Sequence, residues 1–124
     1  MEKNTVTAKL NNLRISPRKV QLVVREIAGK DAATAKRILR FAEKRSAKPL
    51  LKLLDSAVSN AKNRDMDGSK LKVKEVLLGS GATLKRGRFV SRGSYHRIMK
   101  RTSNIKMTLT FEVESGEKEE KNGK

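Results

Sequence analysis

The sequence predicts an α+β fold in which three helices pack on a small three-stranded antiparallel sheet that carries a long, extended basic β-hairpin. Three segments in the first half of the chain have apolar residues at helical spacing, and three other segments alternate apolar and polar residues as half-buried strands do. Between the last two strands, a basic stretch punctuated by glycine has no acidic residue from Glu75 to Glu112. This stretch is the predicted hairpin.

The first predicted elements are a strand and two helices. Residues 6–10 alternate apolar and polar side chains and predict a short half-buried strand. Ser16 and Pro17 then indicate a helix start, because serine caps helix N-termini and proline in the first helical position loses no hydrogen bond. Gly29 supplies the stop of this helix, and Asp31 can cap a second, shorter helix.

The third predicted helix is the longest, and its start depends on Pro49. Its apolar stripe runs from Leu50 to Ala61. Inside a helix, proline removes a hydrogen bond and clashes with the preceding turn. A start at an N-cap Ser46 places the proline harmlessly in the first turn, whereas a start near Glu43 predicts a kink. The later start is preferred.

The remaining two strands frame the basic stretch. Residues 71–78 alternate with one slip of phase that suggests a bulge, and residues 105–113 have the cleanest alternation in the chain. If Leu78 lies opposite Ile105, the hairpin midpoint falls between Ser91 and Arg92, and the turn is made by Arg92 with the glycine after it. About ten residues at roughly 3.3 Å each then give arms of about 30 Å.

The chain is long enough for one domain with a modest core. We expect this domain to occupy residues 1–113, with the hairpin extension at about 80–104. Residues 114–124 are charged and have no apolar anchor, which predicts a disordered tail.

Composition favours nucleic acid as the partner. Lys and Arg number 30 against 13 Asp and Glu, which gives a net charge of +17. The acid-free stretch has too few apolar side chains to fold on the domain, and its positive charges repel one another. A surrounding polyanion would therefore order it. The alternative is a solvated, floppy loop. A membrane partner is disfavoured, because the chain has no long apolar run and no lipidation motif. The absence of Cys and of a signal peptide fits a cytoplasmic protein.

Catalytic and metal-binding groups are scarce. The only histidine, His96, lies in the basic stretch, where we expect a polar contact to RNA or water. Asp65, Asp67 and Gly68 faintly resemble a cation-binding loop but lack its later oxygen ligands, so a turn is expected. We therefore predict no cofactor, no metal and no enzyme activity.

Two features leave alternatives open. Arg14, Arg18 and Lys19 gather at the start of the first helix, where cations oppose the helix dipole. Contact with phosphate explains them, although a solvated face is the alternative. Phe89 and Tyr95 could stack on exposed bases or pack on each other across the hairpin.

Three separated motifs resemble the bacterial large-subunit ribosomal protein family that is numbered twenty-two in the universal nomenclature. They occupy residues 13–20 (LRISPRKV), 56–61 (SAVSNA) and 97–105 (RIMKRTSNI). The resemblance runs from about Thr5 to Val113. Departures are local: the family usually has Pro-Arg-Ala at positions 89–91, Gly-Arg-Ala at positions 93–95, and histidine at position 104.

The resemblance implies a structural constituent of the large ribosomal subunit, with a compact domain near the exit of the peptide tunnel and a hairpin that runs inward through ribosomal RNA. Its implied partners are large-subunit ribosomal RNA of the 23S type, neighbouring large-subunit proteins and the nascent peptide, with no membrane and no homo-oligomer. Its implied roles are subunit assembly and lining of the exit tunnel. The predicted RNA-binding residues are Arg14, Ser16, Arg18, Lys19, Lys85, Arg86, Arg88, Arg92, Arg97, Lys100, Arg101 and Thr102. The predicted tunnel-lining tip is Arg88, Phe89, Val90, Ser91, Arg92 and Gly93.

Two other functions are alternatives. A DNA-bending architectural protein with basic β-arms needs a dimer and a wedge residue at each arm tip, and the Arg92-Gly93 turn supplies no wedge. An RNA-processing enzyme would depend on His96 or Asp65.

Overall fold

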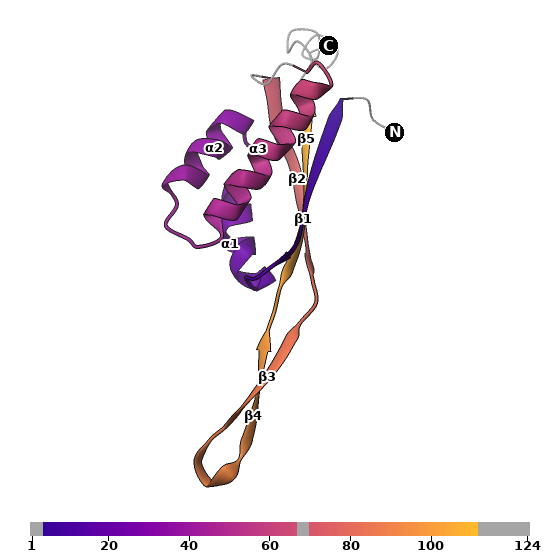
Figure 1. Ribbon diagram of the computed structural model, residues 1–124. Helices are drawn as coiled ribbons and strands as arrows, with labels where there is room; N and C mark the ends of the chain where they lie inside the picture. Colours follow the sequence, from indigo (N-terminus) through magenta and orange to yellow (C-terminus); the bar gives the residue numbers. More distant parts are fainter. Residues whose placement is uncertain (1–3, 67–69, 112–124) are drawn as a thin grey trace, which may run out of the picture.

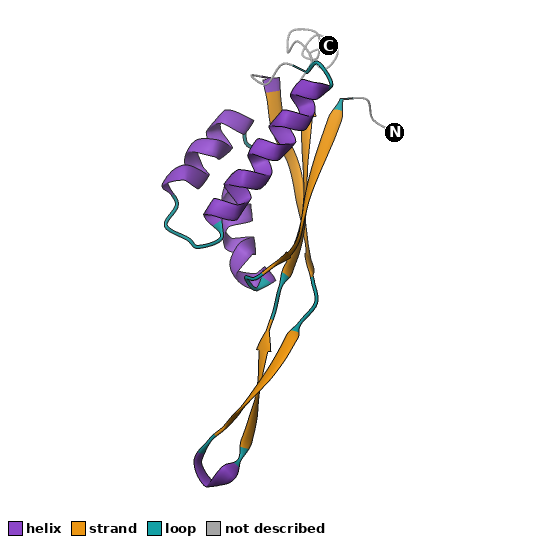
Figure 2. Ribbon diagram, viewed as in Figure 1, coloured by secondary structure: helices purple, strands orange, loops and turns teal. Residues whose placement is uncertain are grey.

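The computed structural model describes residues 4–66 and 70–111 (Figure 1). The helices within these ranges are α1 (Pro17–Ile27), α2 (Ala32–Phe41) and α3 (Ala47–Asn63). The strands are β1 (Thr5–Leu13), β2 (Leu71–Ser80), β3 (Leu84–Phe89), β4 (Tyr95–Lys100) and β5 (Ser103–Phe111). Figure 2 shows the helices gathered on one side of the sheet and the hairpin extending away from the domain. The predicted fold class is confirmed.

The main sheet has three antiparallel strands in the order β1-β5-β2. Leu78 pairs with Ile105, which is the pairing assumed in placing the hairpin midpoint. The predicted phase slip in β2 is also confirmed, because the register with β5 shifts between Val73 and Glu75. The expected end of the last strand at Val113, and the tail over residues 114–124, lie outside the described residues.

The helix starts follow the sequence signals. Ser16 precedes α1, with Pro17 in its first position, and the Ser16 carbonyl accepts the Val20 N–H at 3.2 Å. Ser46 precedes α3, so Pro49 lies in the first turn and the preferred later start is confirmed. None of the described helices has the length and apolar character needed to cross a membrane.

The core lies entirely between the helices and the main sheet. Its largest fully buried side chains are Ile27, Leu39, Leu50, Leu54, Leu71, Ile105, Met107 and Leu109. By contrast, every side chain from Lys85 to Lys100 is exposed. The hairpin therefore contributes nothing to the core, and apolar burial does not stabilise its arms.

The hairpin is a separate two-stranded sheet of β3 and β4. The main ladder stops at the pair of Ser80 and Ser103, and the hairpin ladder begins at the pair of Leu84 and Lys100. Three residues on the outgoing arm thus oppose two on the return arm. This difference moves the hairpin midpoint from the predicted position, between Ser91 and Arg92, onto Arg92 itself.

The hairpin turn lies where the sequence places it. A short 3-10 turn spans Ser91–Gly93. Arg92 and Gly93 both have positive φ, at 62° and 70°. Arg92 is thus a non-glycine residue in the left-handed region, which few side chains enter readily.

Candidate nucleic-acid interface

Hydrogen bonds of Thr102 join the two arms at the root of the hairpin. The Thr102 hydroxyl donates to the Ala82 carbonyl at 2.6 Å, and the Gly81 N–H donates to the Thr102 carbonyl at 3.0 Å. A Cβ at Gly81 would overlap the Thr102 hydroxyl, so the close approach of the two arms requires glycine here.

Ser103 and Asn104 tie the return arm to the start of the chain. The buried Ser103 hydroxyl donates to the Ile15 carbonyl at 2.5 Å. The Asn104 side-chain oxygen accepts the Asn12 N–H at 2.9 Å. These bonds set the direction in which the hairpin leaves the domain.

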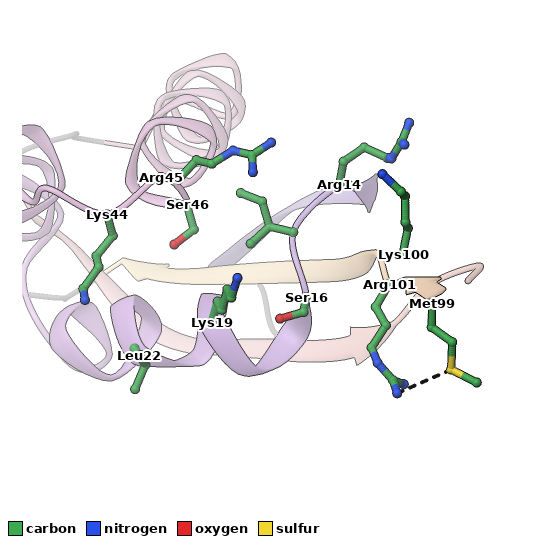
Figure 3. Close-up of a pocket in the computed structure, with 11 residues that line it drawn as sticks. Arg14, Ser16, Lys19, Leu22, Lys44, Arg45, Ser46, Met99, Lys100 and Arg101 are labelled. Atoms are coloured by element: carbon green, nitrogen blue, oxygen red, sulfur yellow. Dashed lines mark hydrogen bonds between the residues drawn. The ribbon is translucent and has the colours of Figure 1, made fainter. Parts of the chain in front are cut away.

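A basic groove lies beside this root (Figure 3). We call it the root groove. It has a volume of about 920 Å³ and is formed by the start of α1, the loop before α3 and the end of β4. Six cationic side chains from these three segments line it: Arg14, Lys19, Lys44, Arg45, Lys100 and Arg101.

The root groove is suited to phosphate. No acidic residue lines it, and within the described ranges no ion pair joins one of its cations to a carboxylate. Arg101 contacts a neutral partner instead, the Met99 sulfur, at 3.6 Å. Guanidinium groups recognise phosphate with paired hydrogen bonds, and lysine ammonium groups add compact charge.

The structure brings five of the predicted RNA-binding residues together in the root groove: Arg14, Ser16, Lys19, Lys100 and Arg101. Arg18 is exposed on α1 but does not line the groove. Thr102 is only 3% exposed, and its hydroxyl holds the two arms together rather than facing solvent.

Sequence reasoning missed Lys44 and Arg45. They lie in the loop between α2 and α3, where a pair of charges ordinarily means a solvated turn. The only signal available was that this loop ends at Ser46, the cap of α3, and so has a fixed place in the fold. Only the tertiary fold, which brings the loop before α3 to the groove lined by the start of α1, shows that these cations lie beside the hairpin root.

The arms carry the remaining predicted RNA-binding cations. All of them are exposed: Lys85, Arg86, Arg88, Arg92 and Arg97. His96 is also exposed and pairs with Arg88 across the hairpin. No group of three or more side chains able to hold a metal ion occurs in the described part of the chain.

The two aromatic residues of the hairpin contact each other. The rings of Phe89 and Tyr95 meet edge to face, with centroids 5.4 Å apart, so packing across the hairpin is confirmed. Gly87 makes room for this pair, because a Cβ there would overlap the Tyr95 ring. Phe89 and Tyr95 remain 76% and 61% exposed, and stacking on bases stays a prediction.

The acidic turn after α3 is only partly described. Asp65 lies in the turn, as expected, at a φ of 62°. Asp67 and Gly68 lie outside the described residues.

Comparison with known proteins gives a consistent result. The family model described as "Ribosomal protein L22p/L17e" matches residues 8–110. Similar curated proteins carry the name large ribosomal subunit protein uL22. The relative from Mesoplasma florum is 47% identical over 106 residues, which cover 85% of this chain and 95% of the relative. The relative from Mycoplasmopsis agalactiae is 46% identical over 114 residues, covering 91% and 100%. The relative from onion yellows phytoplasma is 41% identical over 126 residues, covering 99% and 98%.

Proposed function

Because this chain belongs to the L22p/L17e family of ribosomal proteins, we propose that it binds 23S-type ribosomal RNA through its root groove and the arms of its hairpin. The protein is a structural component of the large ribosomal subunit in the cytoplasm, and not an enzyme. Its neighbours there are ribosomal RNA and other large-subunit proteins. The proposal goes further in assigning the RNA contacts to particular residues, a tunnel-lining role to the hairpin tip, and a role in subunit assembly.

The root groove is the observation that carries the RNA-binding proposal. Six cations from three segments that are far apart in the sequence converge there with no carboxylate among them. Bringing like charges together is unfavourable in the free protein, and phosphate groups relieve this repulsion while releasing their counterions. The groove adjoins the hairpin, so one RNA segment seated in the groove can continue along the arms.

The shape of the hairpin supports the proposal for the tip. Figure 1 shows the turn at the far end of the molecule from the helices, so it reaches furthest from the domain. The residues proposed to line the tunnel, Arg88 through Gly93, are all exposed. We propose that these residues form part of the tunnel wall and meet the nascent peptide. Their sequence differs from the usual pattern of the family, so the wall here has its own shape.

RNA binding is tested by the salt dependence of affinity for a 23S-type transcript. If each of the six groove cations neutralises one phosphate, the groove alone contributes a slope of roughly 4 to 5 in log Kd against log salt. Filter binding between about 50 and 200 mM salt measures this slope, and the arms add to it. A slope near 1 would contradict the proposal.

The tip assignment has a separate test. A photo-cross-linker in place of Arg92 should form adducts with a stalled nascent peptide in translating ribosomes. The same cross-linker in place of Arg25, an exposed residue of α1, should form none. Equal yields at the two positions would remove the tip from the tunnel wall.

Membership of a ribosomal protein family argues against both alternatives. A DNA-bending protein with paired β-arms would have to bind plain duplex DNA as tightly as ribosomal RNA. An RNA-processing enzyme would have to cleave RNA in a way that depends on His96 or Asp65.

A further inference from the structure

A second groove lies between α3 and the edge of β1, and we call it the edge groove. It has a volume of about 320 Å³. Apolar side chains supply half of its lining: Leu10, Leu13, Pro49 and Leu53. The other lining residues are Lys9, Lys48, Lys52 and Ser56. Unlike the root groove it contains no arginine, and like the root groove it contains no acidic residue.

The edge groove lies beside an open stretch of sheet edge. β1 is the outer strand of the main sheet, with β5 on its other side. The N-terminal half of its outer edge is covered by α3, because Arg64 donates to the Thr5 carbonyl at 2.8 Å and Asn60 donates to the Thr7 carbonyl at 3.0 Å.

The cover ends before Lys9. Backbone groups of alternate residues in a strand point to the same side, and the register with β5 is regular from Thr5 to Leu10. The Lys9 N–H and C=O therefore point outward like the carbonyls of Thr5 and Thr7. Among the described residues, none forms a hydrogen bond with them. An unpaired edge of this kind can pair with a strand from another chain.

The chemistry of the edge groove selects a peptide rather than RNA. An apolar floor gives nothing to a phosphate backbone, whereas a hydrophobic side chain gains by covering it. The lysines at the rim attract any anionic group as point charges, so the apolar floor is what favours a peptide, and the lysines favour carboxylates on that peptide. An exposed sheet edge beside an apolar groove is the arrangement by which many proteins bind extended peptides.

We propose that the edge groove docks an extended acidic segment of another large-subunit protein. The segment pairs with β1 at Lys9 and places an apolar side chain on the floor of the groove. Its carboxylates face Lys48 and Lys52. The inference rests on the place of this protein in the large subunit, but it does not depend on the RNA contacts assigned to the root groove.

Photo-cross-linking in purified large subunits tests the occupant. One variant carries p-benzoylphenylalanine in place of Lys52, and the matched control carries it in place of Arg45 in the root groove. The Lys52 adduct should survive ribonuclease, be destroyed by protease, and map to a protein segment with an apolar residue flanked by acidic ones. The Arg45 adduct should be destroyed by ribonuclease.

The two positions separate the two hypotheses. Four outcomes at Lys52 would overturn the docking proposal: an adduct with RNA, with a basic protein segment or with a second copy of this chain, or no adduct at all. A missing RNA adduct at Arg45 would count against the proposed function and leave the docking proposal standing.

Strand pairing has its own readout in the free protein. A synthetic peptide of the cross-linked segment should slow hydrogen exchange of the Lys9 amide by about tenfold or more, because pairing protects it. The Ala8 amide already faces β5 and serves as the internal control. Binding without protection at Lys9 would overturn the strand-pairing part of the proposal.

Discussion

Replacing Lys44 and Arg45 together by Gln tests the root groove at the two cations that sequence reasoning missed. Both residues line the groove, both are exposed, and neither is part of the core. The expected loss is therefore one of RNA affinity, with the free energy of unfolding nearly unchanged. Surface substitutions of this kind usually change stability by less than about 0.5 kcal/mol.

The magnitude follows from the number of charges removed. Each phosphate neutralised contributes roughly 0.7 to 0.9 to the slope of log Kd against log salt, so two lost contacts lower the slope by roughly 1.4 to 1.8. The affinity difference between variant and parent should be largest at low salt and shrink as salt rises. The assay is filter binding to a 23S-type transcript at four or more salt concentrations.

The matched control replaces Arg25 and Lys62 by Gln. These residues are exposed on α1 and α3 and do not line the root groove. Their replacement removes two positive charges, as the replacement of Lys44 and Arg45 does. If binding depended only on net charge, both double variants would lose the same slope. Equal losses would therefore refute the root groove as a binding site, and so would an unchanged slope in the groove variant.

Three further predictions concern the hairpin and its root. Gly81→Ala should lower the free energy of unfolding, measured in urea, by about 1 to 3 kcal/mol, because the new methyl group meets the Thr102 hydroxyl. Gly79→Ala is the control, because a methyl group at Gly79 has open space and meets no such clash. Ser103→Ala should cost about 1 to 3 kcal/mol in the same assay, because it leaves the Ile15 carbonyl without its donor; a loss below about 0.5 kcal/mol would contradict this role. The third variant replaces Arg86, Arg88 and Arg92 together by Ala. Its free energy of unfolding should stay within about 0.5 kcal/mol of the parent value, while subunit assembly or passage through the tunnel is disturbed. A large loss of stability would show that the arms support the core.

The sequence was most informative where local chemistry decides structure. Ser16 with Pro17 located the start of α1, and Ser46 ahead of Pro49 located the start of α3, because proline is tolerated only in the first turn. The alternation over residues 105–113 located β5, which the structure shows to be the central strand of the sheet. The long acid-free run between two alternating segments located the hairpin.

Features that depend on packing between distant segments were out of reach. The hairpin midpoint was half a residue off, since nothing local shows that three residues would oppose two at the root. The Phe89–Tyr95 contact was one of two open alternatives, and the close approach of Gly87 that permits it has no sequence signature. Lys44 and Arg45 belong to the site only because the fold brings the loop before α3 next to the start of α1 and the end of β4.

The root and the arms of the hairpin have different energetics, and this difference bears on how the protein would assemble with RNA. The root is held by hydrogen bonds of Thr102, Ser103 and Asn104 to the domain or to the opposite arm, so its direction is set before RNA arrives. The arms bury no side chain, and beyond their backbone ladder one aromatic pair holds them.

We therefore expect hydrogen exchange of the arm amides in the free protein to be much faster than that of the β5 amides, and to slow when RNA binds. NMR measures both rates; arm amides as protected as those of β5 without RNA would show that the hairpin does not need the polyanion to hold its shape. Because the root is already fixed, RNA has to order only the arms. The conformational entropy of orienting the hairpin is lost when the domain folds, so it does not reduce the affinity for RNA.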